Sequence, residues 1–206
     1  MDPPFWLDKW NKNEIGFHQL EPHAALARYW PLLGLPTGSR VFVPLAGKSP
    51  DLGWLAAAGH QVIGIELSPR AVEQFYSENT GLVLDHIDLR CGNFFELTPA
   101  LLGPIAAIFD RASLIALPAP MRTRYVALLA ALQTPGVQTM LITLEYDSRK
   151  MSGPPHSVAA DEVNRLYAGT HRIECIARND QLADFPKFRE RGLDQLAEVI
   201  YRLERR

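Results

Sequence analysis

Residues 40–67 read RVFVPLAGKSPDLGWLAAAGHQVIGIEL, with two short apolar runs on either side of a helix-like segment. The runs Arg40–Leu45 and Gln61–Leu67 predict buried strands, because continuous apolar, β-branched-rich sequence suits a parallel sheet covered on both faces. Ser49-Pro50 predicts the start of the intervening helix, with serine at N-cap and proline at N1. Gly59 follows three alanines and can end that helix in the left-handed conformation. The stretch therefore predicts a strand–helix–strand unit with a right-handed crossover.

The same alternation continues along the chain. Ser68-Pro69 repeats the helix-start signal, and Ala119–Leu132 has the apolar spacing of a helix. Two further apolar runs, Ile105–Asp110 and Thr139–Tyr146, predict strands, and Arg172–Ala177 predicts another. Together these elements predict an α/β fold with a doubly wound sheet.

The end of the chain carries two conflicting patterns. Leu193, Leu196, Ile200 and Leu203 have helical spacing, whereas residues 198–203 (EVIYRL) alternate as a strand does. The residues alone leave helix and strand both open for this segment.

The letters AGKS (46–49) match the end of a phosphate-binding loop. That loop needs G-x-x-x-x-G-K-[ST], and its first glycine falls on Phe42, inside the first predicted strand. Gly47 alone is too little glycine for backbone amides to surround a triphosphate. We therefore exclude a nucleotide triphosphatase, and we expect Lys48 to be structural or to lie at the rim of a ligand site.

Glu66 indicates a different ligand. It ends the second predicted strand, 19 residues past Gly47, where an acidic residue of a doubly wound fold accepts hydrogen bonds from ribose hydroxyls. A dinucleotide also needs the glycine-rich G-x-G-x-x-G turn, which this loop lacks, so a nicotinamide oxidoreductase is disfavoured. S-adenosyl-L-methionine carries a ribose and no phosphate, and the pattern therefore favours methyl transfer.

Composition excludes several other classes of protein. The 206 residues carry a formal net charge of −2 without a dense Lys/Arg run, so a nucleic-acid partner is not expected. Cys91 and Cys175 lie far apart with no metal-type spacing, which predicts no metal site and favours a reducing compartment. Apolar runs stay below the ~20 residues of a membrane span, and the amino-terminal segment has no signal-peptide pattern. We expect a cytoplasmic monomer that acts on a small molecule, without a membrane partner.

Four stretches of the chain resemble thiopurine S-methyltransferases of the compact bacterial type. They are FWLDKWNKNEIGFHQ (5–19), VFVPLAGKSPDLGWLAAAGHQVIGIELSPRAVEQF (41–75), IFDRASLIALPAPMRTRY (108–125) and LITLEYDSRKMSGPPHSV (141–158), with a weaker match in RGLDQLAEVIYRL (191–203). The resemblance implies one seven-stranded Rossmann-like methyltransferase domain over residues 1–206, with an N-terminal helical lid in residues 1–35. It implies S-adenosyl-L-methionine as methyl donor, and an antiparallel seventh strand at Glu198–Leu203.

The resemblance also implies cofactor-binding residues. Trp10 would pack over the cofactor, Leu45 would lie in the loop after the first strand, and Glu66 would bind the ribose. Gly92 and Asn93, which follow the third strand, would lie beside the adenine. Aromatic faces suit the positively charged sulfonium, which gives Trp10 a physical reason in addition to the resemblance.

The methyl acceptor would meet a second set of residues. Arg111 matches an arginine near the sulfonium and the acceptor, which makes it a candidate cofactor-binding residue and also the candidate catalytic group that holds an anionic sulfur. Asp110 would orient Arg111 or shape the acceptor floor. Phe17 matches an aromatic residue that touches the substrate, and Met151 and His156 are candidate wall residues.

The chain departs from the family pattern at three positions. Ala46 replaces a common cysteine, Asn93 replaces a frequent acidic residue, and His156 stands where phenylalanine usually follows Gly-Pro-Pro. A second arginine that assists the acceptor in some relatives would fall near Lys187 or Arg189. The change at His156 affects the preference for the acceptor.

Three readings of the function follow. The first is methyl transfer to the sulfur of an aromatic or heterocyclic thiol, which is ionised near neutral pH and so needs no strong general base. The second keeps the fold and methylates halide, selenium or tellurium species in detoxification. The third is a non-catalytic binder, which the joint presence of Trp10, Leu45, Glu66 and Arg111 disfavours.

Overall fold

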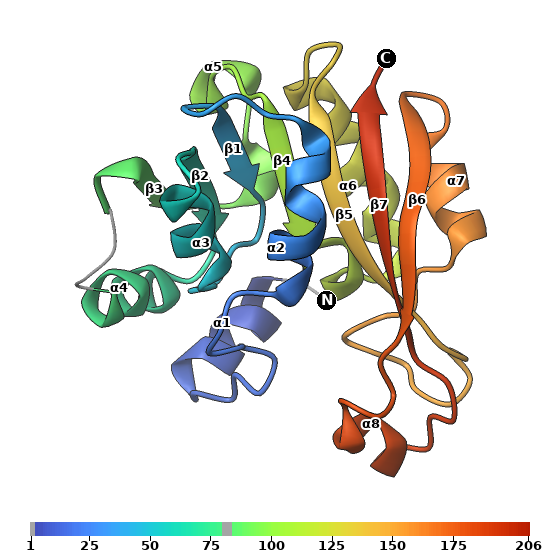
Figure 1. Ribbon diagram of the computed structural model, residues 1–206. Helices are drawn as coiled ribbons and strands as arrows, with labels where there is room; N and C mark the ends of the chain where they lie inside the picture. Colours follow the sequence, from blue (N-terminus) through green and yellow to red (C-terminus); the bar gives the residue numbers. More distant parts are fainter. Residues whose placement is uncertain (1–2, 80–83) are drawn as a thin grey trace. The chain divides into compact units, whose positions relative to one another are not determined.

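The computed structural model describes residues 3–79 and 84–206. The chain forms two compact units, one up to Phe109 and the other from Asp110 onward. Seven strands form a sheet in the order β3-β2-β1-β4-β5-β7-β6 (Figure 1). This arrangement confirms the predicted α/β class with a seven-stranded, Rossmann-like sheet.

The first unit is built on parallel strands. Gly64 of β2 pairs with Val43 of β1 and Leu89 of β3, and Phe42 of β1 pairs with Ile108 of β4. The strands are β1 (Arg40–Val43), β2 (Gln61–Glu66), β3 (Ile87–Cys91) and β4 (Ala107–Arg111), the last of which crosses into the second unit. The helical segments are α1 (Pro3–Asn11), α2 (Ala24–Tyr29), η1 (Trp30–Leu33), α3 (Asp51–Ala57), α4 (Pro69–Glu78), η2 (Leu84–His86), η3 (Phe94–Glu96) and α5 (Pro99–Leu102).

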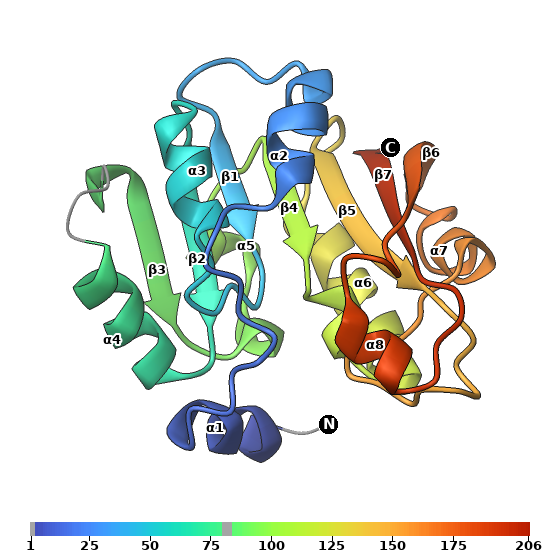
Figure 2. The same ribbon diagram turned by 60° about the horizontal axis from the view of Figure 1, so that its bottom comes forward.

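The carboxyl ends of β1, β2 and β3 share one edge of the first unit. Parallel strands put these ends, and the loops that follow them, on the same side of the sheet. In both views α1 lies beyond this edge (Figures 1 and 2). The strands are almost fully buried along their apolar runs, as in Val41, Phe42 and Ile63, which explains why those runs predicted strands correctly.

The second unit ends in an antiparallel arrangement. Strand β7 (Ala197–Arg205) lies between β5 (Gln138–Glu145) and β6 (His171–Asp180) and is antiparallel to both. The helical segments are η4 (Leu114–Ala116), α6 (Ala119–Leu132), α7 (Ala160–Tyr167) and α8 (Pro186–Glu190). The segment with α8 lies beyond the carboxyl end of β5 in both views (Figures 1 and 2).

Most predicted elements agree with these bounds to within two residues, and the helix Ala119–Leu132 is confirmed at both ends. Ser68 caps α4 by accepting from the Ala71 amide at 3.3 Å, with Pro69 at the first helical position. Gly59 follows α3 with φ +92°, as predicted for a left-handed residue that ends a helix.

One local prediction needs correction. Helix α3 begins at Asp51 with Pro50 at N-cap, one residue later than the Ser49-Pro50 signal predicts. The Ser49 hydroxyl nevertheless accepts from the Asp51 amide at 3.3 Å, and it also donates to the Asp51 carboxylate at 2.9 Å. For the end of the chain, where the pattern left helix and strand both open, Leu193 and Leu196 are buried in an irregular segment, and the strand implied at Glu198–Leu203 is present as β7 (Ala197–Arg205).

Candidate active site

The loop after β1 has an unusual backbone. Leu45 has φ +46° and Gly47 has φ +56°, both in the left-handed region. That region is uncommon for a residue with a β-carbon and costs roughly 1 kcal/mol at Leu45. The Ala46 amide donates to the Ile65 carbonyl at 2.9 Å, so the loop is held against β2. The structure thus concentrates backbone strain where the sequence predicts the cofactor.

Glu66 connects the loop after β1 to the loop after β2. One carboxylate oxygen accepts from the Gly47 amide at 2.9 Å and the other accepts from the Ser68 amide at 2.7 Å. Burial raises the pKa of Glu66, opposed by the hydrogen bonds from the amides of Ser68, Gly47 and Leu67. An ionised carboxylate offers about four acceptor positions, so about one remains for a hydroxyl donor of a ligand. Glu66 therefore holds the two loops together and keeps acceptor capacity for a ribose.

Helix α1 covers the loop with aromatic side chains. Trp10 is only 4% exposed, and its ring atom Cζ2 lies 3.2 Å from the position that a β-carbon on Gly47 would take. Phe17, 48% exposed, packs edge-to-face on Trp10 and on Trp6, with ring centroids 5.7 and 5.5 Å apart. These contacts place the two predicted aromatic residues of the lid beside the loop after β1.

The later part of the predicted lid region packs into the protein core. Met1 and Asp2, the first two residues of the range 1–35, lie outside the described residues. Trp30 is buried, and its indole donates to His60 Nε2 at 3.0 Å. Within the described part of the range, the residues around α2 and η1 thus belong to the core of the first unit, and the segment around α1 and Phe17 covers the loop.

Gly92 and Asn93 follow β3 at the same edge. The Gly92 amide donates to the Glu66 carbonyl at 2.8 Å, and a β-carbon at position 92 would lie 3.1 Å from Ile65 Cδ1. The Asn93 side chain accepts from the Phe95 amide and donates to Glu96, both at 3.0 Å. Asn93 therefore caps η3 and shapes the loop through its side chain.

Lys48 makes a structural contact, as the sequence predicts. Its ammonium group pairs with the Glu78 carboxylate at the end of α4, 2.7 Å away. The contact joins the loop after β1 to α4. Six predicted residues are thus found around the loops of the first unit: Trp10, Phe17, Leu45, Glu66, Gly92 and Asn93.

The second unit carries Arg111 at the end of β4, where it is half-buried. The preceding residue, Asp110, is fully buried, and its oxygens accept from the Leu114 amide at 3.2 Å and the Tyr125 hydroxyl at 2.8 Å. Burial raises the pKa of Asp110 to about 6 against these two hydrogen bonds. Ala112 has φ +62°, a second non-glycine residue in the left-handed region beside a predicted site residue.

Met151 and His156 lie in the loop after β5. Met151 is 4% exposed and packs with Tyr146, Leu193 and Leu196, so its side chain supports the segment before β7. The His156 amide donates to the Ile115 carbonyl at 2.7 Å, and the ring nitrogen Nε2 is buried without a hydrogen-bond partner among the described residues. Burial, and then the nearby Arg122 cation, lower the pKa of His156, which favours a neutral imidazole.

Arg122 is a residue that the sequence analysis does not single out. It is 3% exposed, donates to the Leu117 carbonyl at 2.9 Å and to the Ser157 carbonyl at 3.4 Å, and pairs with Glu162 at 2.7 Å. From the sequence alone, an arginine between the apolar positions of a helix is expected to be exposed to solvent. Its burial becomes evident only from partners that lie far away along the chain. Arg122 joins η4, the loop after β5 and α7.

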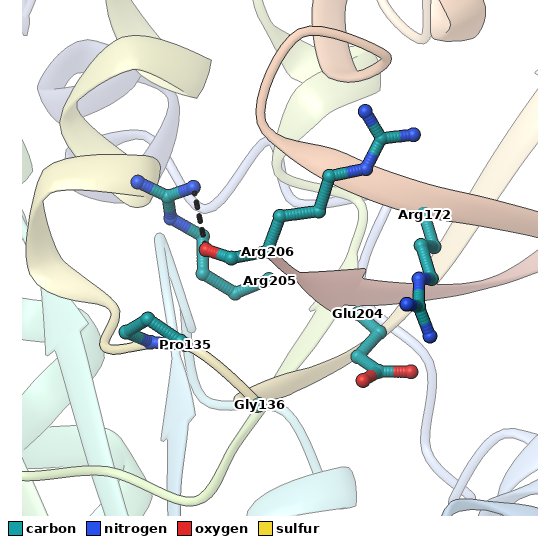
Figure 3. Close-up of a pocket in the computed structure, with 6 residues that line it drawn as sticks. All are labelled: Pro135, Gly136, Arg172, Glu204, Arg205 and Arg206. Carbon is teal, nitrogen blue, oxygen red and sulfur yellow. Dashed lines mark hydrogen bonds between the residues drawn. The ribbon is translucent and has the colours of Figure 1, made fainter.

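The second unit also has a concavity at the opposite ends of its strands. About 620 Å³ in volume, it lies where β5 begins and β7 ends (Figure 3). It is lined by Pro135, Gly136, Arg172, Glu204, Arg205 and Arg206. None of these is a predicted site residue, and Arg205 is engaged with backbone carbonyls of Ala130 and Thr170. The predicted site residues lie elsewhere, in or beside the loops that follow strands of the first unit and, in the second unit, at the end of β4 and in the loop after β5.

Comparison with known proteins identifies the family. The model of the family "Thiopurine S-methyltransferase (TPMT)" matches residues 1–206. The chain belongs to the thiopurine S-methyltransferase family. The thiopurine S-methyltransferase of Bordetella petrii is 46% identical over 100% of this chain and 99% of its own length. That of Pseudomonas fluorescens is 45% identical over 98% and 99%.

Solved structures agree with the fold. A S-adenosylmethionine-dependent methyltransferase from Thiobacillus denitrificans, in complex with S-adenosyl-L-homocysteine, has a TM-score of 0.69 at 14% identity over 97% of this chain and 98% of its own. A 1,6-didemethyltoxoflavin-N1-methyltransferase from Burkholderia thailandensis has a TM-score of 0.68 at 16% identity over 99% and 87%. Membership in the thiopurine S-methyltransferase family confirms the predicted enzyme class and the predicted cofactor, S-adenosyl-L-methionine.

Within residues 3–79 and 84–206, no helix is long and apolar enough to cross a membrane. The same residues contain no group of three or more His, Cys, Asp and Glu side chains arranged to hold a metal ion.

Proposed function

We propose that this chain transfers the methyl group of S-adenosyl-L-methionine to the sulfur of an aromatic or heterocyclic thiol, in the manner of its thiopurine S-methyltransferase relatives. The observation that carries the proposal is the Glu66 carboxylate, which is bound to the amides of Gly47 and Ser68 at the carboxyl end of β2. A carboxylate there is suited to accept hydrogen bonds from a ribose.

The loop after β1 fits a cofactor without phosphate. Its amides at Ala46, Gly47 and Ser49 donate to the Ile65 carbonyl, the Glu66 carboxylate and the Ala46 carbonyl, respectively. Amides engaged in this way are not directed at a phosphate, unlike those of a phosphate-binding loop. The donor pattern therefore supports S-adenosyl-L-methionine over a nucleotide.

Residues of this chain would bind the reactants and exclude water. S-adenosyl-L-methionine supplies a methyl group bonded to a sulfonium. Glu66 would bind its ribose, and the aromatic rings of Trp10 and Phe17 would cover the cationic centre. Burial of the reacting atoms favours attack by a sulfur anion on a sulfonium, because water stabilises both charges before they cancel.

Arg111 would bind the acceptor anion. Its guanidinium is permanently charged and donates to an anionic sulfur without accepting a proton. The thiolate sulfur forms a bond to the methyl carbon as the sulfonium–methyl bond breaks, and both products are uncharged at sulfur. An acidic thiol arrives already ionised, so no general base is required. Positioning of the two reactants contributes several kcal/mol, up to roughly 10.

Release of S-adenosyl-L-homocysteine with a panel of acceptors tests the proposal. Aromatic and heterocyclic thiols should be methylated faster than halide, selenite or tellurite. Methylation of the inorganic species alone would favour the detoxifying alternative, and absence of S-adenosyl-L-homocysteine binding by isothermal titration would refute the proposal. Size-exclusion chromatography tests the predicted monomer, and replacement of His156 by phenylalanine tests its effect on acceptor preference.

A further inference from the structure

The Asp110 carboxylate forms a hydrogen-bonded bridge across the end of β4 and the turn after it, a segment that contains Arg111. Its carboxylate accepts from the amide of Leu114, four residues later, at 3.2 Å. The bridged residues include Arg111 and Ala112, and Ala112 has φ +62°. A left-handed alanine costs roughly 1 kcal/mol and persists only where surrounding contacts enforce it. The bond from Asp110 to Leu114 is such a contact, and the Ser113 hydroxyl adds one by donating to the Arg111 carbonyl at 3.4 Å.

A hydrogen bond from helix α6 orients the Asp110 carboxylate. The Tyr125 hydroxyl on α6 donates to the other Asp110 oxygen at 2.8 Å. Asp110 is fully buried, so a hydrogen bond there is worth more than one exposed to water. The side chain consequently has little freedom, and the turn after β4 has one well-defined backbone path.

A second buried tyrosine lies near the same carboxylate without sharing this role. Tyr167 on α7 is close enough to Asp110 for their charges to raise the pKa of the tyrosine, after burial as the larger cause. Its hydroxyl has no hydrogen-bond partner among the described residues. Tyr125 and Tyr167 are therefore two buried tyrosines beside Asp110, and only Tyr125 holds it.

We propose that Asp110 and Tyr125 are positioning residues, which hold the turn after β4 in the backbone conformation that directs Arg111 to the methyl acceptor. This inference rests on the proposed function of Arg111. Neither residue needs to touch the acceptor: Asp110 acts through the Leu114 amide and the strained Ala112, and Tyr125 acts through Asp110.

The positioning depends on pH in a defined direction. Burial raises the pKa of Asp110 to about 6, with Tyr125 and Leu114 opposing the shift. The titratable groups that face the carboxylate are Tyr125 from α6 and Tyr167 from α7, and both tyrosines have a pKa raised well above the usual value. Both therefore remain neutral across the range in which Asp110 titrates. Below about pH 6 the protonated acid loses acceptor strength, and acceptor turnover should fall.

Tyr125→Phe and Tyr167→Phe form a matched pair of variants that test the proposal. Each removes one buried hydroxyl from a tyrosine near Asp110. Tyr125→Phe should lower acceptor kcat/KM by about 10- to 100-fold, because a small displacement of a positioning group costs this much. It should leave S-adenosyl-L-homocysteine affinity, measured by isothermal titration, unchanged. Tyr167→Phe should leave both quantities unchanged.

Asp110→Asn supplies a second readout through the pH profile. The acceptor should be a thiol so acidic that it stays ionised from about pH 5 to pH 8, so that its own titration does not enter. Wild-type kcat/KM should then show an acid limb near pH 6, and Asp110→Asn should have a lower value without that limb. A merely structural role would change the amount of folded enzyme without removing the limb.

The outcomes separate this inference from the proposed function. Equal kcat/KM for Tyr125→Phe and Tyr167→Phe would overturn the inference, and so would an acid limb that survives in Asp110→Asn. Either result leaves methyl transfer by the wild type in place. If the wild type methylates no thiol in the panel, the proposed function fails and the inference fails with it.

Discussion

At the scale of single residues, the Glu66 carboxylate holds two loops together, and we propose that it also binds the ribose of the cofactor. Its hydrogen bonds to Gly47 and Ser68 hold two loops, and its remaining acceptor position suits a ribose. Glutamine keeps the shape of the side chain and one acceptor oxygen. Its NH2 group is a donor, however, and would face one of the two backbone amide donors, so the variant tests both roles together.

Glu66→Gln should therefore weaken cofactor binding. We expect the S-adenosyl-L-homocysteine Kd to rise by about 10-fold or more, because a charge-assisted hydrogen bond is worth about 1.5–3 kcal/mol. Isothermal titration measures the change. Arg111→Ala is the comparison, since it should act mainly on acceptor turnover. An equal loss of cofactor affinity in both variants would contradict this division of roles.

At the scale of elements, the position of α1 depends on a glycine in the loop after β1. Trp10 lies so close to Gly47 that a β-carbon there would meet its ring at 3.2 Å. Gly47 also has φ +56°, so a substitution strains the backbone as well. Gly34 has a similar φ of +64°, and a β-carbon added to it would meet nothing within 4 Å.

Gly47→Ala and Gly34→Ala separate these two effects. Each should lose about 1 kcal/mol of stability through left-handed strain, visible as a lower Tm in thermal unfolding. Gly47→Ala alone should also displace α1, with faster amide exchange in residues 3–11 and weaker S-adenosyl-L-homocysteine binding. If Gly34→Ala weakens binding to the same extent, backbone strain and not the contact with Trp10 is responsible.

The second element-scale feature is the buried ion pair of Arg122 and Glu162, which links α6 to α7. Removal of Arg122 leaves the mostly buried Glu162 carboxylate with a weaker pair to the exposed Arg165, 3.9 Å away. Arg122→Met should therefore lower the free energy of unfolding by about 3 kcal/mol, and Arg122→Met/Glu162→Leu should recover much of that loss. Urea unfolding measures both. Arg149→Met is the control, because its pair with Asp147 is solvent-exposed and should contribute nothing measurable. Additive losses in the double variant would argue against a coupled pair.

At the scale of the whole molecule, stability against pH is the sum of contributions with opposite signs. Burial, and then Arg205, lower the pKa of His171 to about 4, and its Nε2 lies 2.9 Å from Gln133 in the core. This contribution is present above the unfolded value of 6.5 and is lost as pH falls toward 4. Asp110 acts oppositely, because its pKa is raised from 3.8 to about 6 and its stabilising effect at low pH is lost as pH rises through that window.

His171→Gln should flatten the acid side of this profile. We expect wild type to lose about 2–3 kcal/mol through this histidine between pH 6.5 and pH 4, and the variant to lose none of it. Urea unfolding at several pH values measures the slope. Asp110→Asn should change the slope in the opposite sense, with a relative gain above pH 6. An unchanged slope in His171→Gln would show that the histidine is not buried as a neutral group.

Much of the fold follows from local pattern. The strands β1, β2, β4 and β5 were predictable because each is a short run of apolar residues that becomes buried on both faces of a sheet. Ser68-Pro69 and Gly59 were reliable because capping needs one side chain or one backbone conformation. The one-residue shift of the α3 start to Asp51 was not predictable, although the Ser49 hydroxyl does accept from the Asp51 amide.

The residues of the candidate site likewise include some that local pattern predicts and some that only tertiary contacts reveal. The position of Glu66 at the end of β2 was predictable, because a strand end and a loop repeat at fixed spacing in this kind of fold. The dependence of the loop on Trp10, the burial of Met151 under Leu193 and Leu196, and the bond from Tyr125 to Asp110 were not predictable. Each of these joins residues far apart in sequence, and no periodicity records such a contact.

The sequence by itself therefore determined the alternation of strands and helices, the acid at the end of β2 and the absence of a phosphate loop. Tertiary structure decided that residues 197–205 form a strand. Helical and alternating patterns coexist in this part of the sequence, and hydrogen bonding to β5 and β6 selects the strand. Tertiary structure also decided which polar side chains are buried. The physical reason is that burial and hydrogen-bond partners depend on neighbours brought together by folding, whereas caps and apolar runs act within a few residues.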